Sequence, residues 1–250
     1  MNDNKNDAWD NLHMFYKTQD WINKPNVFAE EIVKYIKQGA KILELGAGQG
    51  QDTRFFASKG FDVTSTDISD DALNLNKSKL PQEFSSRVVI QRLDMTTKLP
   101  FSDGEFDVVY AHLSFHYFDL ATTKSVLKEI YRVLKQNGLF IMLNNSTSDP
   151  EYNTGKQIEQ DYFVIEDKNK RFFSKESLRE LVKDYFDVVL LDDLGETYKD
   201  AEKGIHKLIR FIGSKKPSDL FKMAVPFTGA IIEKQTQSGE IELLIQTRWK

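Results

Sequence analysis

The stretch Lys41-Ile-Leu-Glu-Leu-Gly46-Ala-Gly48-Gln-Gly50 decides the fold of this chain. Its first five residues are mostly apolar and predict a short buried strand, and three glycines follow at alternate positions. Glycine has no β-carbon, so the backbone of such a turn can approach a ligand closely, although an ordinary strand-to-helix connection looks similar. A dinucleotide-binding fingerprint needs Gly-x-Gly-x-x-Gly, and Gln51 stands where its last glycine would fall. The stretch therefore disfavours a nicotinamide-dependent oxidoreductase.

Strand-like and helix-like patterns alternate along the rest of the chain. Short apolar runs predict strands, and apolar residues three or four positions apart predict amphipathic helices. This alternation is typical of a doubly wound α/β fold, with a mainly parallel seven-stranded sheet and helices on both faces. The predicted strands are 41–45, 61–66, 88–93, 106–111, 139–143, 187–191 and 206–213, and the predicted helices are 25–38, 52–59, 70–79, the segment from Asp119 to Asn137, and the segment after Ser174.

Acidic residues follow the second and third predicted strands. In open α/β sheets, ligands bind beyond the carboxyl ends of the strands, where Asp67 and Asp94 fall. A carboxylate at Asp67 can accept hydrogen bonds from both hydroxyls of a ribose, and one at Asp94 can pair with an adenine amino group. Each acid could equally cap a turn or a helix. Together with the glycine turn, they stand in the order expected of an adenosyl-binding site.

These segments resemble the successive motifs of class I S-adenosylmethionine-dependent methyltransferases. The similar segments are 41–50, Asp67, 93–95, 106–117 and 129–140, and the resemblance covers about residues 10–216. The family usually has Pro-Gly-Gly where this chain has Gln136-Asn137-Gly138, a departure confined to a turn that asparagine tolerates. The resemblance implies S-adenosylmethionine as cofactor and methyl transfer to a small-molecule acceptor. The alternative is a non-catalytic module that binds S-adenosylmethionine or S-adenosylhomocysteine.

The resemblance also implies which residues would bind the methyl donor. The loop after the first strand would face its methionine part, the residues after the second strand its ribose and adenine, those after the third the adenine edge, and those after the fourth its methyl group. An aromatic N-terminal segment, 9–21, would close over it as a lid or simply staple the N-terminus. In that order the residues are Glu44, Gly46, Ala47, Gly48, Gly50; Asp67, Ile68; Asp94, Met95; Ala111, His112; and Tyr16.

On the acceptor side, His112 and His116 are the histidines nearest the expected site. Methyl transfer from a sulfonium is an in-line displacement, so positioning supplies most of the acceleration, and a base is needed only when the acceptor must lose a proton early. Either histidine could be that base, or both could only shape the pocket. Acceptor recognition is expected in the insertion 144–173, because loops beyond the strand ends carry specificity.

Composition excludes several classes of site. The chain has no cysteine, which excludes disulfides and thiolate metal sites, and its four histidines lack metal-ligand spacing, so no metal is expected. The net charge of −4 argues against a nucleic-acid substrate. The N-terminus is polar, and no apolar run is long enough for a membrane span, so the expectation is a cytoplasmic protein without membrane association.

The last part of the chain lies beyond the family resemblance. We expect a methyltransferase domain over 1–216 and an extension over 217–250, in which 227–234 and 240–249 form a hairpin joined by 235–239. An isolated hairpin is rarely stable, so this one would pack on something, for example across a homodimer interface. The tail also weakly resembles the opening hairpin of a Nudix domain, in 231–233 and 243–249, without that domain's metal-binding helix.

Overall fold

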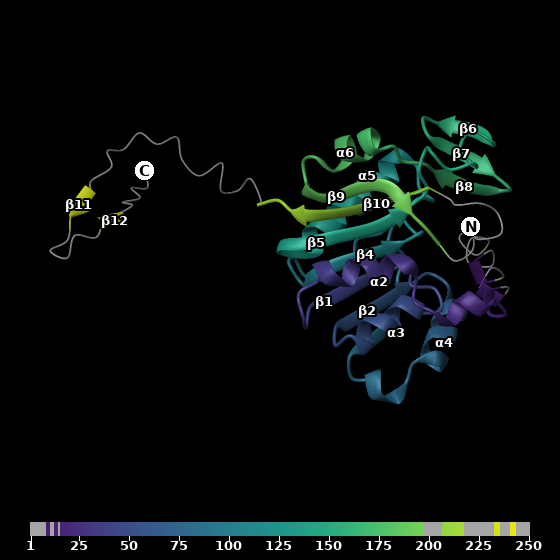
Figure 1. Cartoon of the computed structure of the whole chain (residues 1–250), viewed down its shortest axis with the longest axis horizontal. Coiled ribbons are helices and arrows are strands. Elements are labelled where there is room, and N and C mark those ends of the chain that lie inside the picture. The colour runs from purple at the N-terminus through teal and green to yellow at the C-terminus, as the bar shows by residue number, and fades with distance from the viewer. Residues whose placement is uncertain are drawn as a thin grey trace. The chain divides into compact units, whose positions relative to one another are not determined.

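The computed structural model describes residues 9–10, 13–14, 16–197, 207–217, 233–235 and 241–243 (Figure 1). The chain divides into two compact units, Met1–Lys216 and Pro217–Lys250, which are described separately. None of the helices in the described ranges has the length and apolarity needed to cross a membrane.

A seven-stranded sheet forms the centre of the first unit, with strand order β3-β2-β1-β4-β5-β10-β9. The first five strands pair in parallel, and β10 runs antiparallel to both β5 and β9 (Figure 1). This arrangement confirms the predicted mainly parallel sheet. The strands are β1 (Lys41–Leu45), β2 (Asp62–Asp67), β3 (Val88–Arg92), β4 (Phe106–His112), β5 (Leu134–Asn144), β9 (Phe186–Gly195) and β10 (Leu208–Lys215).

Local sequence signals fix where the main helices begin. Ser69 accepts a hydrogen bond from the Ala72 amide at 3.0 Å, and Asp119 accepts one from the Thr122 amide at 2.7 Å, so each satisfies an unpaired N–H at a helix start. Ser174 caps the last helix in the same way. The helices are η1 (Asp20–Asn23), α2 (Val27–Ile32), η2 (Val33–Tyr35), α3 (Gln51–Ser58), α4 (Asp70–Lys79), η3 (Gln82–Phe84), α5 (Leu120–Val133) and α6 (Lys175–Val182), where η marks a 3₁₀ helix.

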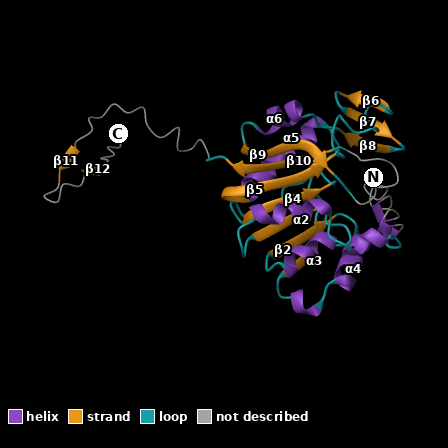
Figure 2. Ribbon diagram, viewed as in Figure 1, coloured by secondary structure: helices purple, strands orange, loops and turns teal. Residues whose placement is uncertain are grey.

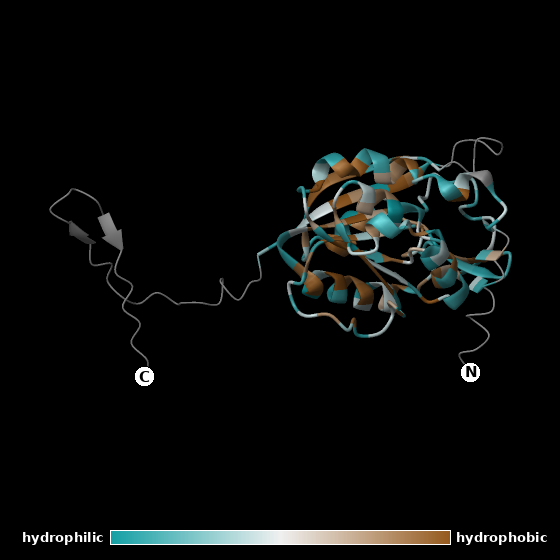
Figure 3. Ribbon diagram, turned by 90° about the horizontal axis from the view of Figure 1, so that it is seen from below, coloured by the Kyte–Doolittle hydropathy of each residue, from teal (hydrophilic) through white to brown (hydrophobic). Residues whose placement is uncertain are grey.

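Helices cover both faces of the sheet, as Figure 2 shows. One buried cluster joins α5 and α6 to alternate residues of the strands, including Leu43 and Leu45 of β1. A second cluster joins α2 and α3 to the intervening residues, including Ile42. Hydrophobic and hydrophilic stretches alternate along the helices in Figure 3, as expected of amphipathic helices packed on a sheet. The strand ends therefore project from a rigid, two-sided core.

Two predicted helix bounds are wrong. The expected helix 25–38 is a six-residue α-helix, α2, that continues as the 3₁₀ helix η2, and the change falls at the adjacent β-branched residues Ile32 and Val33. The helix α5 ends at Val133 rather than at Asn137. Asn137, with φ of 62°, instead lies in a bulge of β5, where the partners of β4 jump from Leu134 to Leu139.

The insertion between β5 and α6 holds a small antiparallel sheet, β6-β7-β8, that no sequence pattern indicated. Its strands are β6 (Lys156–Glu159), β7 (Tyr162–Ile165) and β8 (Lys168–Arg171). All four residues of β6 are exposed, so the strand lacks the alternation of apolar and polar residues that is typical of a half-buried strand. We call this element the insertion sheet.

In the second unit, β11 (Glu233–Gln235) and β12 (Ile241–Leu243) pair antiparallel, as the predicted hairpin requires. Gln235 belongs to a strand rather than to the turn. The other residues of the predicted strands and turn, and most of the Nudix-like segments, lie outside the described residues, as does His206 at the predicted start of β10.

Candidate active site

The glycine loop after β1 is fixed by its backbone. Gly46, Gly48 and Gly50 have φ of 74°, 55° and 74°, values that residues with a side chain rarely adopt. The Gly46 and Ala47 amides both donate to the Thr66 carbonyl, at 2.9 and 2.8 Å. The loop is thereby tied to the end of β2, the neighbouring strand.

Asp67, the last residue of β2, is joined to the same loop. One carboxylate oxygen accepts from the Gly48 amide at 2.8 Å and the other from the Ser69 amide at 2.9 Å. The residue is 8% exposed. Because each carboxylate oxygen can accept more than one hydrogen bond, Asp67 is held in place and can still accept from hydroxyl groups. Ile68 follows it, half-buried, with its carbonyl bonded to Arg92.

Glu44 of β1 is buried, and its side chain is bonded to α3. Its carboxylate accepts from the Thr53 hydroxyl at 2.5 Å, and that hydroxyl also contacts Ser65 at 2.8 Å. Burial, and second the charge of Asp52, raise the pKa of the Glu44 carboxyl well above its usual value. The structure thus places Glu44 in a buried polar network with Thr53 and Ser65.

The end of β3 meets the loop through Met95. The Met95 methyl group lies 3.6 Å from where a β-carbon on Gly46 would stand. Asp94, half-buried, accepts from the amide and the hydroxyl of Thr96, at 2.9 and 2.6 Å. This is the turn-capping alternative for Asp94, and it commits one carboxylate oxygen to the turn.

The ends of β1 and β4 lie where the strand order reverses, which is where open α/β sheets bind ligands. Ser114 links them, donating to the Leu45 carbonyl at 2.6 Å. Ala111 is fully buried, and His112 is half-buried with its ring 6.5 Å from that of Tyr110. The Ser114 contact escaped the sequence analysis, because serine after a strand carries no distinctive signal.

His116 is held at the ends of β4 and β5. Its residue is 3% exposed, and its Nδ1 lies 3.2 Å from the Asn144 side-chain oxygen. An amide oxygen only accepts, so Nδ1 carries the proton, and in the neutral ring Nε2 is the basic nitrogen. The arrangement therefore assigns a tautomer suited to proton acceptance at Nε2.

The N-terminal aromatic segment lies on these loops. The Gln49 side chain donates to the His13 carbonyl at 2.7 Å, and the Trp9 ring packs edge-on against Tyr117 at 4.7 Å. Tyr16 lies 6.2 Å from the His13 ring, ring centre to ring centre, and burial raises the pKa of its phenol. Sequence reasoning named Tyr16 but missed His13 and Gln49, whose contact joins segments 36 positions apart.

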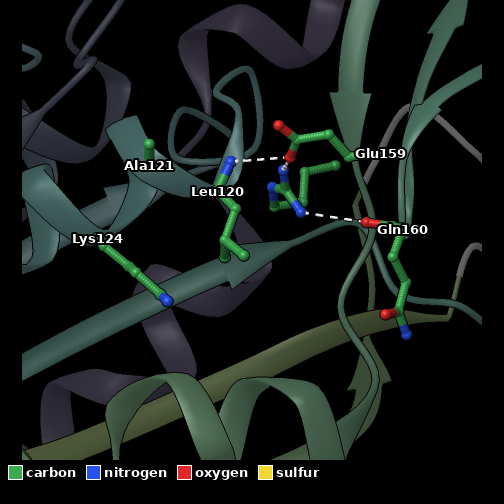
Figure 4. Close-up of a pocket in the computed structure, with 6 residues that line it drawn as sticks. Leu120, Ala121, Lys124, Glu159 and Gln160 are labelled. Atoms are coloured by element: carbon green, nitrogen blue, oxygen red, sulfur yellow. Dashed lines mark hydrogen bonds and ion pairs between the residues drawn. The ribbon is translucent and has the colours of Figure 1, made fainter.

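A surface hollow of about 410 Å³ lies next to the loop after β4, between the start of α5 and the insertion sheet (Figure 4). It is not at the glycine loop. Glu159 bonds the Leu120 amide across its wall, as the figure shows. The lining residues are Leu120, Ala121, Lys124, Glu159, Gln160 and Arg171. Within the described ranges, no three His, Asp or Glu side chains are grouped so as to hold a metal ion.

Comparison with known proteins gives consistent matches. Residues 43–142 match the family described as a methyltransferase domain. An uncharacterized methyltransferase of Synechocystis is 35% identical over 109 residues, 44% of this chain and 49% of that protein. A demethylmenaquinone methyltransferase of Clavibacter sepedonicus is 33% identical over 109 residues, 44% of this chain and 42% of that protein. The chain thus spans less than half the length of these curated relatives.

Among solved structures, the fold is similar to that of the 1,6-didemethyltoxoflavin-N1-methyltransferase of Burkholderia thailandensis, determined with bound 1,6-didemethyltoxoflavin and S-adenosylhomocysteine. The TM-score is 0.64 at 17% identity, over 84% of this chain and 85% of that one. Such low identity establishes the fold alone. Residues 43–142 of the chain are therefore similar to the methyltransferase-domain family, and they lie in a sheet with the fold of the class I S-adenosylmethionine-dependent methyltransferases.

Proposed function

We propose that the chain transfers a methyl group from S-adenosylmethionine to a small-molecule acceptor. The observation that carries this proposal is the hydrogen bond between the glycine loop and Asp67, which the Gly48 amide donates to the carboxylate at 2.8 Å. The glycine turn lies where the strand order reverses, and its backbone can come close to a ligand. A carboxylate fixed beside that turn is suited to binding the ribose of the same ligand. We further propose that residues 1–216 form the methyltransferase domain and 217–250 an extension.

The residues present fit this donor. Asp67 would hold the ribose hydroxyls, Ile68 and Met95 would pack on the adenine, and the backbone around Gly48 would face the methionine part. Tyr16 would cover the donor from the N-terminal segment. Asp94, Ala111 and His112 complete the proposed set, and Glu44 would support the loop from beneath.

When bound, the donor supplies a methyl group on a sulfonium, which is already a strong electrophile. The protein's own task is then to orient the acceptor and to exclude water. Where an acceptor must lose a proton, His116 Nε2 would take it, because Asn144 fixes the proton on Nδ1. Burial raises the pKa of Tyr16 and of Tyr117, so both phenols stay protonated and would act as walls or hydrogen-bond donors.

Three observations support a small acceptor. The chain has a net charge of −4 and no basic surplus that would attract nucleic acid. Both named relatives above with stated substrates, the demethylmenaquinone and the 1,6-didemethyltoxoflavin enzymes, carry a small organic molecule in their names. Aromatic side chains from the N-terminal segment and the loop after β4 meet at Tyr117, a setting suited to a planar ring.

Calorimetric titration with S-adenosylmethionine, S-adenosylhomocysteine and NADH tests the proposal. We expect both adenosyl compounds to bind and NADH not to bind. Asp67→Asn should weaken binding about 10- to 100-fold, the usual effect of losing hydrogen bonds to a charged group. Asp62→Asn is the matched control, because Asp62 begins the same strand and pairs at the surface with Arg87. Binding of NADH alone, or equal effects of the two variants, would contradict the assignment.

If the chain binds S-adenosylmethionine but transfers no methyl group, its function is that of a non-catalytic binding module. A screen with methyl-labelled S-adenosylmethionine against quinols, phenols and nitrogen heterocycles separates the two. Label in any product, lost in His116→Gln at unchanged donor affinity, would support a transferase with His116 as base.

A further inference from the structure

The backbone of the loop after β4 is held from outside by the insertion sheet. Three consecutive carbonyls accept hydrogen bonds from that sheet: His116 from the Arg171 amide at 2.7 Å, Tyr117 from the Tyr162 hydroxyl at 3.1 Å, and Phe118 from Arg171 Nε at 3.0 Å. Two residues of the insertion thus fix three successive peptide groups of the loop.

Arg171 is itself firmly held. Its side chain is 6% exposed, its guanidinium lies 4.7 Å from the centre of the Tyr162 ring, and it donates to Glu159 at 2.5 Å and to the Gln160 carbonyl at 3.3 Å. Glu159 in turn accepts from the Leu120 amide at 3.0 Å, at the start of α5. A buried, paired guanidinium with several fixed donors is a rigid anchor, because each bond restricts the same planar group.

His116 is consequently fixed from two sides. Its carbonyl is bonded to Arg171 of β8, and its ring is bonded to Asn144 at the end of β5. The carbonyl and the ring both belong to His116, so a shift of its peptide group would also move the ring relative to Asn144. The 3.2 Å bond that places the proton on Nδ1 therefore depends on the insertion sheet.

We propose that Arg171 is a positioning residue, which holds the loop after β4 so that His116 keeps its Nδ1–H tautomer and its basic Nε2. This inference rests on the proposed function for its purpose, because His116 matters as a base only in a transferase. The side chain of Arg171 bonds to Phe118, Glu159 and Gln160, whereas the loop after β4 meets the donor half of the site through Ser114. The hydrogen bonds that hold Gly46, Ala47 and Asp67 come from β2, the glycine loop and Ser69.

The test compares Arg171→Met with Lys170→Met in the full chain. Lys170 is the preceding residue of β8 and pairs with Glu151 at 2.5 Å, so the control removes the same charge from the same strand and leaves the loop bonds intact. Long-range ¹H–¹⁵N spectra of the imidazole nitrogens report the tautomer of each of the four histidines, and His116→Gln assigns the signal. Calorimetry with S-adenosylhomocysteine is run on the same samples.

In the wild type and in Lys170→Met, we expect His116 to be protonated at Nδ1. Arg171→Met keeps the main-chain amide bond to the His116 carbonyl and removes the Nε bond to the Phe118 carbonyl, two residues further along the same loop. The ratio of the two His116 tautomers should then fall by up to about tenfold, the effect of one lost hydrogen bond, while S-adenosylhomocysteine affinity stays within twofold. An unchanged His116 spectrum in Arg171→Met would overturn the inference, as would an equal change in Lys170→Met.

Should Arg171→Met not fold, Arg171→Lys is judged by the same criteria, because lysine keeps the charge opposite Glu159 but has no Nε–H to donate to Phe118. Failure of the wild type to bind S-adenosylhomocysteine would count against the proposed function. The histidine spectra would still decide whether Arg171 positions His116, so the two failures are distinguishable.

Discussion

Replacing Gly50 by alanine tests whether the glycine loop is fixed by its neighbours as well as by its backbone. Gly50 precedes α3 with φ of 74° and ψ of 29°. A β-carbon there would stand 1.9 Å from the side-chain oxygen of Asn76, which must therefore move. Asn76 is fully buried and donates to Ser65 at 2.9 Å, so it has no free space to enter and a hydrogen bond to lose. Gly39 offers the matched control, because its φ is 72° and nothing lies within 4 Å of its β-carbon position.

The expected magnitudes differ accordingly. A left-handed conformation costs a residue with a side chain about 1–2 kcal/mol, which is the whole expected loss for Gly39→Ala. Gly50→Ala adds about 1–3 kcal/mol for overpacking and about 1 kcal/mol for the bond between Asn76 and Ser65. We therefore expect Gly50→Ala to lower the free energy of unfolding by about 3–6 kcal/mol.

Urea unfolding of the full chain, followed by circular dichroism and tryptophan fluorescence, measures both variants. In an Asn76→Ala background, Gly50→Ala should cost no more than Gly39→Ala does in the wild type, because the obstructing side chain is gone. Equal destabilisation by Gly50→Ala and Gly39→Ala in the wild type would refute the argument from packing.

Two further predictions concern buried and capping carboxyls. The folded state keeps a proton on Glu44 that the unfolded state releases, so wild-type stability should fall as pH rises above the usual pKa of glutamate. Glu44→Gln should flatten that fall in urea unfolding at pH 5 and pH 8, and parallel slopes would contradict it. Asp119→Ala should cost about 1 kcal/mol at neutral pH through loss of the α5 cap, against little for Asp70→Ala, an exposed first-turn residue of α4. The bond from the Thr122 amide lowers the pKa of Asp119, so the loss should shrink as pH falls through the usual range of aspartate.

The sequence was sufficient for features that local chemistry decides. The strand that runs into the glycine turn, the caps at Ser69, Asp119 and Ser174, and the placement of Asp67 at a strand end all depend on residues close together in the chain. Their geometry follows from periodicity and capping, so each could be predicted from the order of the residues alone.

Features that depend on distant partners could not be predicted in this way. The carbonyl of Phe118 and the guanidinium of Arg171 are 53 positions apart, and Ser114 and Leu45 are 69 apart. Strand alternation did hold a usable signal for Glu44, because Leu43 and Leu45 face the α5 and α6 side and leave Glu44 for the other. The exposed strand β6 has no comparable signal in a single sequence.

The insertion sheet separates the residues that hold the loop after β4 from the segment that resembles the methyltransferase-domain family. Residues 43–142, which match the methyltransferase-domain family, contain the proposed donor-binding residues apart from Tyr16. The groups that hold the loop after β4, Tyr162 and Arg171, come from outside that shared segment. Changes confined to the insertion sheet could therefore alter the loop after β4 while the proposed donor-binding residues stay as they are. If the chain is the transferase proposed above, exchanging the insertion sheet between proteins of this fold would change the setting of His116 without touching the proposed donor site.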